Sequence, residues 1–282
     1  HRQFRHFLGD DFCKDRAMTS KTLCIIIPVY NEVAGLPHLF DRLDSIAASM
    51  STEFALSIHY IFIDDGSSDD SFALLNAHDF GARPVRLLQF SRNFGKEAAL
   101  SAGIDAAEYA DAVVLMDADL QHPPELIPEM VRLWKEEGYE VVEGIKALRG
   151  KESLVNKVGA NLFYHILSKF SGFDINQASD FKLLDKKVVR AWQSMEERNT
   201  FFRGMSAWVG FNRVSVPFNT RNRTNGTSKW SLFKLFKLAI NAITSFSSFP
   251  LHIVTFMGLV FLAGSLILGI QTIYMKLKGI AY

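Results

Sequence analysis

The residues best suited to chemistry follow an apolar run at residues 112–116. Two carboxylates stand there one residue apart, Asp117 and Asp119, and the amide of Gln121 follows at the same interval. Side chains on an extended backbone alternate between two faces, so all three point the same way if the chain stays extended. Their oxygens suit a hard divalent cation such as Mg²⁺ or Mn²⁺, which would keep open positions for substrate phosphates. The alternative is a pair of solvated aspartates in a turn.

The elements that must position these side chains are strands and helices in alternation. Continuous apolar runs, typical of buried parallel strands, cover residues 23–30, 58–63, 85–90 and 112–116. Helical patterns lie between them, at residues 34–48, 71–76 and 96–109. This alternation predicts a doubly wound, mostly parallel α/β sheet, in which ligands bind at the carboxyl ends of the strands.

Polar residues follow each predicted strand. They are Asn31-Glu32, Asp64-Asp65, Ser91-Arg92-Asn93 and Asp117-Ala118-Asp119. One polar strand end is ordinary, but four in one sheet indicate a single extended site. For residues 64–67 an ordinary turn followed by a helix cap is the alternative, since Ser and Asp favour both.

Composition narrows the class of protein. The 282 residues carry 31 Lys and Arg against 30 Asp and Glu, so no global basic field indicates a nucleic-acid partner. A hydrophobic fraction of 48% is ample for a core. The two cysteines, Cys13 and Cys24, do not make a disulfide framework, which favours a reducing, cytosol-facing compartment.

Four ordered motifs carry a family resemblance. They are Ile27-Pro28-Val29-Tyr30-Asn31-Glu32, the acidic segment 64–69, Asn93-Phe94-Gly95-Lys96, and residues 117–124 with the sequence DADLQHPP. From about residue 23 onward the chain resembles the GT-A family 2 glycosyltransferases. More narrowly, it is similar to the polyprenyl-phosphate glycosyltransferases, which include dolichol-phosphate mannose synthase and the bacterial bactoprenol glucosyltransferases.

The resemblance implies a nucleotide-sugar site. The nucleoside would lie against Pro28, Tyr30 and Glu32, and the base and ribose would meet Asp64 and Asp65. The further donor-binding residues that the motifs imply are Asn93, Lys96, Asp117 and Ala118. Asp119, assisted by Asp117 and Gln121, would hold the Mg²⁺ or Mn²⁺ that stabilises the nucleoside diphosphate leaving group. We expect His122, followed by two prolines, to shape the turn, and we leave it out of the site.

A second carboxylate lies in the segment Ser179-Asp180-Phe181, which matches a family motif whose aspartate faces the acceptor. The resemblance implies that Asp180 is catalytic, together with Asp119. A lipid phosphate is already largely a dianion at neutral pH, so Asp180 would orient a substrate, whereas a hydroxyl acceptor would require it as a base. A helix N-cap before Phe181 is the alternative.

Cations gather farther along the chain. Arg203 lies among aromatic residues, and a basic loop with several small residues covers 221–230. The resemblance assigns Arg203, Arg221, Arg223, Ser228 and Lys229 to the donor phosphates or the lipid phosphate, and Arg suits phosphate oxygens because it binds them bidentately. A solvated basic loop is the alternative.

The C-terminal part of the chain indicates a membrane. Residues 229–248 interleave lysines with aromatic and aliphatic residues at helical spacing, which predicts amphipathic juxtamembrane helices, a core helix being the alternative. Residues 249–276 predict a transmembrane helix. The remaining divisions are an N-terminal extension or tag remnant at 1–21, a GT-A catalytic domain at 22–228 and a truncated tail at 277–282. Whether a second span returns the tail to the cytosol stays open.

These expectations combine into a membrane-anchored, inverting glycosyltransferase whose catalytic domain faces the cytosol at the cell membrane. It would transfer a hexose from a nucleotide sugar, UDP-glucose as first choice, to undecaprenyl or dolichyl phosphate. GDP-mannose is the main alternative donor, and aminoarabinose donors stay open, as does a homo-oligomer. A family 2 transferase with a hydroxyl acceptor is a rival, although residues 195–199 lack the Q-x-x-R-W motif of processive synthases. A non-catalytic, nucleotide-binding membrane scaffold is a rival of another class.

Overall fold

A computed structural model describes residues 20–147, 179–194, 210–218 and 249–279 of the chain. The described residues divide between two compact units. The first holds the ranges between 20 and 218, and the second holds the C-terminal helix. The predicted phosphate-binding loop and the predicted juxtamembrane helices lie outside the described residues.

The first unit is built on one sheet. Its strands are β1 (Lys21–Val29), β2 (Leu56–Asp64), β3 (Val85–Gln89), β4 (Ala112–Leu115), β5 (Val141–Lys146), β6 (Lys182–Asp185) and β7 (Arg213–Phe218). Their order across the sheet is β3-β2-β1-β4-β6-β5-β7. The strand β6 runs antiparallel to β4 and β5, and every other pairing in the described sheet is parallel.

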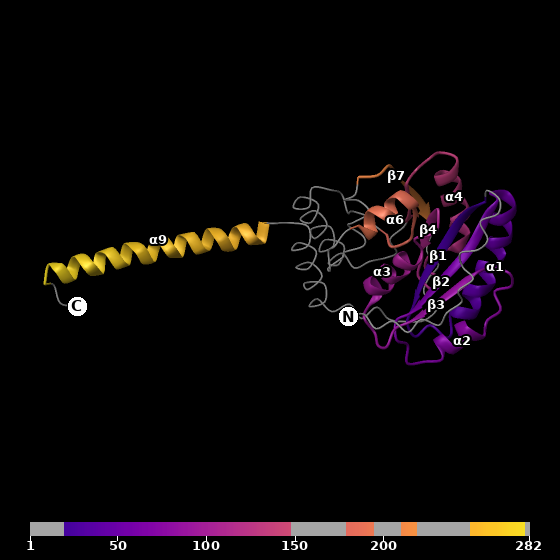
Figure 1. Ribbon diagram of the computed structural model, residues 1–282, viewed down its shortest axis with the longest axis horizontal. Helices are drawn as coiled ribbons and strands as arrows, with labels where there is room; N and C mark the ends of the chain where they lie inside the picture. The colour runs from indigo at the N-terminus through magenta and orange to yellow at the C-terminus, as the bar shows by residue number, and fades with distance from the viewer. Residues whose placement is uncertain (1–19, 148–178, 195–209, 219–248, 280–282) are drawn as a thin grey trace. The chain divides into compact units, whose positions relative to one another are not determined.

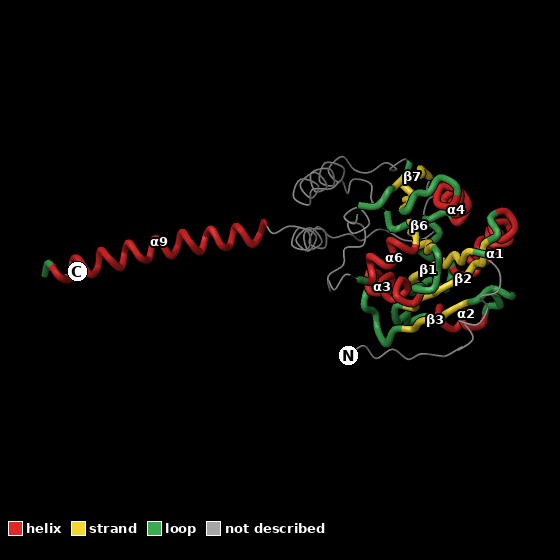
Figure 2. Tube along the Cα trace, turned by 45° about the horizontal axis from the view of Figure 1, so that its top comes forward, coloured by secondary structure: helices red, strands yellow, loops and turns green. Residues whose placement is uncertain are grey.

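Helices cover both faces of this sheet. Figures 1 and 2 show α1 (Leu36–Glu53), α2 (Ser71–Ala77) and α4 (Ile127–Lys135) on one side of the strands. On the other side lie α3 (Lys96–Ala106) and α6 (Lys186–Gln193). Alternate residues of β1 serve the two layers: Ile25 and Ile27 join the core under α1, while Ile26 meets Gly103 of α3. A strand buried on both faces needs an unbroken apolar sequence, which residues 23–27 provide.

The predicted doubly wound, mostly parallel sheet is therefore confirmed. All four strands predicted from the apolar runs are present, with ends that differ from prediction by at most two residues. The short helix η2 (Pro124–Leu126) leads into α4 directly after the acidic motif.

The helix α9 (Phe249–Leu277) belongs to the second unit. Its segment Val254–Leu277 is long and apolar enough to cross a membrane, and no other helix of the described ranges is. The side chains described along this segment are mostly exposed.

Candidate active site

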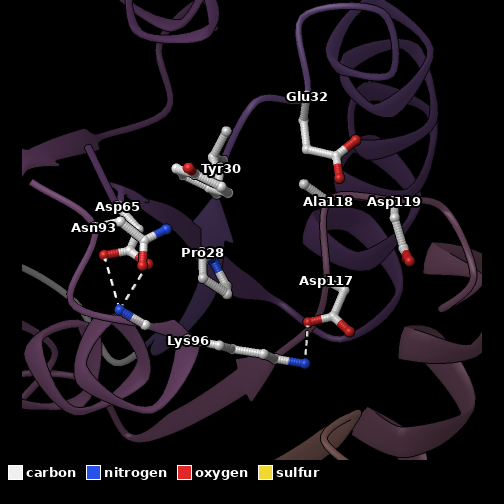
Figure 3. Close-up of a pocket in the computed structure, with 11 residues that line it drawn as sticks. Pro28, Tyr30, Glu32, Asp65, Asn93, Lys96, Asp117, Ala118 and Asp119 are labelled. Carbon is white, nitrogen blue, oxygen red and sulfur yellow. Dashed lines mark hydrogen bonds and ion pairs between the residues drawn. The ribbon is translucent and has the colours of Figure 1, made fainter. Parts of the chain in front are cut away.

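A pocket of about 250 Å³ opens at the carboxyl ends of β1, β2 and β4 (Figure 3). It brings together nine residues that the sequence assigned to a nucleotide sugar or its metal: Pro28, Tyr30, Glu32, Asp65, Asn93, Lys96, Asp117, Ala118 and Asp119. The volume lies just below the roughly 300–1,000 Å³ typical of small-molecule sites. The described residues therefore enclose space for part of a nucleotide sugar.

Two loops at this pocket are tied together by hydroxyl groups. The amide of Asn31 donates to Ser67 Oγ at 3.0 Å, and the amide of Glu32 donates to Ser71 Oγ at 2.9 Å. In return Asn31 Oδ1 accepts from the amide of Ser68 at 2.8 Å. The serines after β2 thus fix the loop that carries Tyr30 and Glu32, which gives the Asp-Gly-Ser-Ser sequence a positioning role.

The two aspartates at the end of β2, Asp64 and Asp65, have different positions in the site. Asp65 lines the pocket, and its carboxylate accepts from the amide of Gly95 at 2.9 Å (Figure 3). It also accepts from the amide of Phe94 at 2.7 Å. Burial raises the pKa of Asp65, although these backbone bonds oppose that effect. Asp64 is 1% exposed, does not line the pocket, and accepts from the amide of Ser67 at 3.3 Å. Its predicted contact with the donor stays a prediction.

Gly66 allows the loops after β2 and β3 to approach each other. Its φ of 68° is strained for other residues, and a Cβ at this position would lie 2.4 Å from the carbonyl carbon of Arg92. The loop that carries Asn93 therefore rests directly on the turn after Asp65.

Lys96, the first residue of α3, crosses the pocket toward Asp117 (Figure 3). Its Nζ lies 2.5 Å from Asp117 Oδ1 and 2.7 Å from Asp180 Oδ2. Burial alone would lower the pKa of Lys96, but the two carboxylates outweigh it and raise that pKa above its usual range. One ammonium group thus joins the acidic motif after β4 to the aspartate before β6.

Asp180 does not line the pocket and is 7% exposed. The segment that follows it is the strand β6, so the helix N-cap that the sequence left open at this position is wrong. The cap of α6 is instead Asp185, which accepts from the amide of Lys187 at 2.8 Å. The contact of Asp180 with Lys96 places it at the buried side of the same charge cluster.

The acidic motif after β4 does not stay extended. The chain turns after Asp117, and Leu120 has a φ of 59°. Gln121 is absent from the pocket lining. Its backbone amide donates to Asp119 Oδ1 at 3.1 Å, and its side-chain Oε1 accepts from Lys146 Nζ at 3.1 Å. The prediction that Asp117, Asp119 and Gln121 point the same way is therefore wrong for Gln121. It required an extended backbone through residue 121, and the chain turns before that residue.

The residues present fit a hard divalent cation. In the ranges that the structure describes, no group of three or more His, Cys, Asp or Glu is placed to hold a metal ion. Mg²⁺ often takes only one or two protein carboxylates, with substrate phosphates and water as its other ligands. Asp117 and Asp119 on the pocket wall supply such a pair of carboxylates.

His122 is confirmed as the residue that shapes this turn. Its Nδ1 accepts from the amide of Asp117 at 3.0 Å, and its ring stacks on Phe181 with centroids 5.0 Å apart. Burial lowers the pKa of His122, which agrees with an Nδ1 that carries no proton. An aromatic ring next to two prolines was the only hint of this role in the sequence.

A buried ion pair near the site was not predicted from the sequence. Lys182 and Glu143 face each other across β6 and β5, with Nζ 2.9 Å from Oε1. Lys182 is fully buried and Glu143 is 5% exposed. Neither residue forms part of a motif, and only the strand register brings them together.

Five predicted phosphate ligands lie outside the described residues. They are Arg203, Arg221, Arg223, Ser228 and Lys229. Their assignment to donor or lipid phosphates stays a prediction.

Comparison with known proteins gives the family. The family model Glycosyl transferase family 2 matches residues 24–189. The chain is 39% identical over 203 residues to the uncharacterized glycosyltransferase YkcC of Bacillus subtilis, covering 72% of this chain and 61% of that protein. It is 35% identical over 248 residues to the prophage bactoprenol glucosyl transferase homolog of Escherichia coli, covering 88% of this chain and 79% of that protein.

A solved structure shares the fold. The mannosyltransferase PcManGT from Pyrobaculum calidifontis, in complex with GDP-Man and Mn²⁺, aligns with a TM-score of 0.50 at 14% identity, over 74% of this chain and 59% of that one. This confirms the GT-A fold that the motifs implied. By its match to the family model and its similarity to the bactoprenol glucosyl transferases, the chain belongs to glycosyl transferase family 2.

Proposed function

We propose that this chain is an inverting hexosyltransferase that moves one hexose from a nucleotide sugar to a polyprenyl phosphate. One observation carries the proposal: Lys96 joins Asp117, on the wall of the pocket, to Asp180, which the family motif assigns to the acceptor. A transferase must bring two substrates to one point, and this contact connects the residues expected to meet each of them.

The pocket supports a nucleotide sugar as donor. Carboxylates such as that of Asp65 can accept hydrogen bonds from ribose hydroxyl groups or a base N–H, and Tyr30, which is 46% exposed, offers an aromatic surface on the pocket wall. UDP-glucose is the first choice of donor, since several relatives at 34–35% identity are named bactoprenol glucosyl transferases. GDP-mannose is the alternative that the test must distinguish.

Asp119, with Asp117 beside it, would hold a divalent cation such as Mg²⁺ or Mn²⁺. When bound, this ion would supply Lewis-acid stabilisation of the diphosphate leaving group. The protein's own part is to keep the two carboxylates at the pocket wall, and the turn between β4 and η2 does so.

The reaction needs no protein nucleophile. An oxygen of the lipid phosphate forms a bond to C1 of the hexose while the bond from C1 to the donor diphosphate breaks, and the electron pair leaves with the nucleoside diphosphate. A single displacement of this kind inverts the anomeric centre. The acceptor phosphate is largely a dianion at neutral pH, so Asp180 orients a substrate rather than removing a proton. Lys96 offsets the two carboxylates where anionic substrates meet.

The acceptor and the location follow from the relatives and from α9. The word bactoprenol in the names of relatives supports a polyprenyl phosphate, and α9 is long and apolar enough to anchor the chain in a membrane. The catalytic unit would then lie at the cytosolic face of the cell membrane, where nucleotide sugars are available. Arg203, Arg221 and Arg223 would bind the phosphates of the two substrates.

Transfer of a radiolabelled hexose tests this function. The full chain in detergent is given UDP-glucose or GDP-mannose with undecaprenyl phosphate, with and without EDTA. We expect organic-phase label from one donor, lost on addition of EDTA and in Asp119→Ala. Asp41→Ala, which removes an exposed carboxylate on α1, is the matched control and should retain activity.

The outcomes separate the alternatives. Label from GDP-mannose alone would change the donor and keep the reaction. Nucleotide binding without transfer to the lipid from either donor would contradict the proposed reaction and favour a hydroxyl acceptor or a binding protein. Transfer that persists in EDTA would contradict the role given to Asp117 and Asp119.

A further inference from the structure

Asp117 and Asp180 are connected in two ways, through Lys96 and through a pair of aromatic rings. Lys96 Nζ contacts Asp117 and Asp180 at 2.5 and 2.7 Å. The same two aspartates are also linked through two stacked, buried rings, those of His122 and Phe181. His122 bonds the backbone of Asp117, and Phe181 follows Asp180 directly in the chain.

The link to Asp117 is a hydrogen bond within one tight turn. The amide of Asp117 donates to Nδ1 of His122 at 3.0 Å, five residues ahead in the chain. His122 is 5% exposed, so little water can replace its ring as the acceptor. The backbone at the start of the acidic motif is therefore set by the position of this ring.

The position of the ring is set in turn by aromatic packing. His122 and Phe181 stack with an interplanar angle of 11°. Phe218 of β7 meets both rings edge-on, at 88° to His122 and 82° to Phe181. Phe181 is fully buried and its carbonyl accepts from the amide of Gly144 at 2.9 Å, so the stack rests on the middle of the sheet.

We propose that His122 is a positioning residue for sugar transfer, which ties the turn carrying Asp117 and Asp119 to the segment that carries Asp180 and leads into β6. The inference rests on the proposed function, because it states how that site holds its donor-side carboxylates at a fixed distance from Asp180. It makes His122 neither a metal ligand nor a proton carrier. Its contribution is to hold the two segments together just beyond Leu115 and Lys182, the last pair of the β4–β6 ladder.

A core-filling role for the ring makes a different prediction. A phenylalanine at this position could stack on Phe181 equally well, but it would leave the amide of Asp117 without its acceptor. An asparagine would lose the stack, yet its Oδ1 can take the place of Nδ1 as acceptor. The two substitutions therefore separate packing from positioning.

The experiment compares His122→Phe and His122→Asn in the full chain. We expect kcat/KM for hexose transfer to fall about tenfold in His122→Phe, and hydrogen–deuterium exchange at the Asp117 amide to accelerate by a similar factor. His122→Asn should keep kcat/KM within about threefold of wild type and keep the amide protected, even where its Tm is lower. His78→Phe is the matched control: His78 also stacks on a phenylalanine, Phe40, at 4.0 Å, and its replacement should change neither quantity.

Three results would overturn the inference. They are kcat/KM in His122→Phe within about twofold of wild type, equal losses in the Phe and Asn variants in proportion to their loss of Tm, and unchanged exchange at the Asp117 amide. If the wild-type chain transfers no sugar, the proposed function fails, and the exchange measurement still decides whether His122 fixes the turn.

Discussion

At the scale of single residues, the site depends on one ammonium group placed between two carboxylates. Two like unit charges about 4 Å apart repel by about 4 kcal/mol at an effective dielectric constant near 20. Lys96 lies between Asp117 and Asp180, so its charge offsets their repulsion and gives both a charge-assisted hydrogen-bond donor. We infer that Lys96 keeps the two carboxylates close together while the substrates exchange.

Replacement of Lys96 by methionine should therefore disable transfer. Two charge-assisted bonds are lost, each worth about 1.5–3 kcal/mol, and we expect kcat/KM to fall at least about 100-fold. Lys96→Arg, which keeps the charge, should recover part of this loss. Steady-state kinetics with the preferred donor is the measurement.

The matched control for this prediction is Lys186→Met. Lys186 also pairs with an aspartate, Asp111, at 3.2 Å, but neither residue lines the pocket. Its replacement should leave kcat/KM within about twofold of wild type. Equal losses in the Lys96 and Lys186 variants would show that the effect is one of general stability.

Residue types and spacing predicted much of the pocket but not its contacts. Nine of the residues assigned to donor or metal line one pocket, because polar strand ends in a parallel sheet meet at one edge. The bridge from Lys96 to Asp180 could not be predicted, since 84 residues separate them. The departure of Gln121 from the pocket depends on a positive φ at Leu120 that sequence spacing does not reveal.

At the scale of elements, the site depends on how closely β5 approaches the aromatic rings of Phe181 and Phe218. Gly144 of β5 leaves the room that Phe181 occupies: a Cβ at Gly144 would lie 2.7 Å from Cδ1 of Phe181 and 3.2 Å from Cε1 of Phe218. Both rings are rigid and buried, so neither can move aside cheaply.

Gly144→Ala should therefore destabilise the catalytic unit and disturb the site together. We expect a loss of about 1–2 kcal/mol in the free energy of unfolding, because overpacking outweighs the smaller entropy of the unfolded chain. Chemical denaturation followed by tryptophan fluorescence measures this loss. Gly258→Ala, where a Cβ in α9 has no neighbour within 4 Å, is the matched control. A Gly144→Ala protein as stable as wild type would mean that Phe181 and Phe218 can shift to make room for the added methyl group.

The elements themselves were more predictable than their order. Apolar runs placed the first four strands because a strand buried on both faces tolerates few polar residues. The insertion of β6 between β4 and β5 in the antiparallel sense could not be derived, since Lys182 pairs with Glu143 inside it and breaks the apolar pattern. From the sequence alone, a Lys and a Glu that form a buried ion pair in a central strand look the same as a Lys and a Glu on the surface.

At the scale of the whole molecule, the proposed reaction requires the chain to reach a lipid phosphate. The segment Val254–Leu277 of α9 contains Lys276 as its one charged residue, and its 24 residues exceed the roughly 20 that span a bilayer. We therefore expect the full chain to remain in membranes after carbonate extraction.

Paired charges in α9 should abolish that retention. Leu262→Arg with Leu266→Arg places two cations on one helix face, four residues apart, at an insertion cost of about 5–7 kcal/mol. We expect this variant in the carbonate-soluble fraction, whereas Leu262→Ile with Leu266→Ile should stay in the membrane. Release of the wild-type chain by carbonate would contradict membrane anchoring by α9.

The most direct test of the central claim is a single-turnover comparison of wild type and Asp180→Asn, with labelled UDP-glucose bound before undecaprenyl phosphate is added. The account predicts that wild type converts its bound donor to lipid-linked glucose and UDP. Asp180 lies outside the pocket lining, so the variant should bind UDP-glucose within about twofold of wild type but transfer it at least about 100-fold more slowly. Transfer by Asp180→Asn at the wild-type rate would contradict the account.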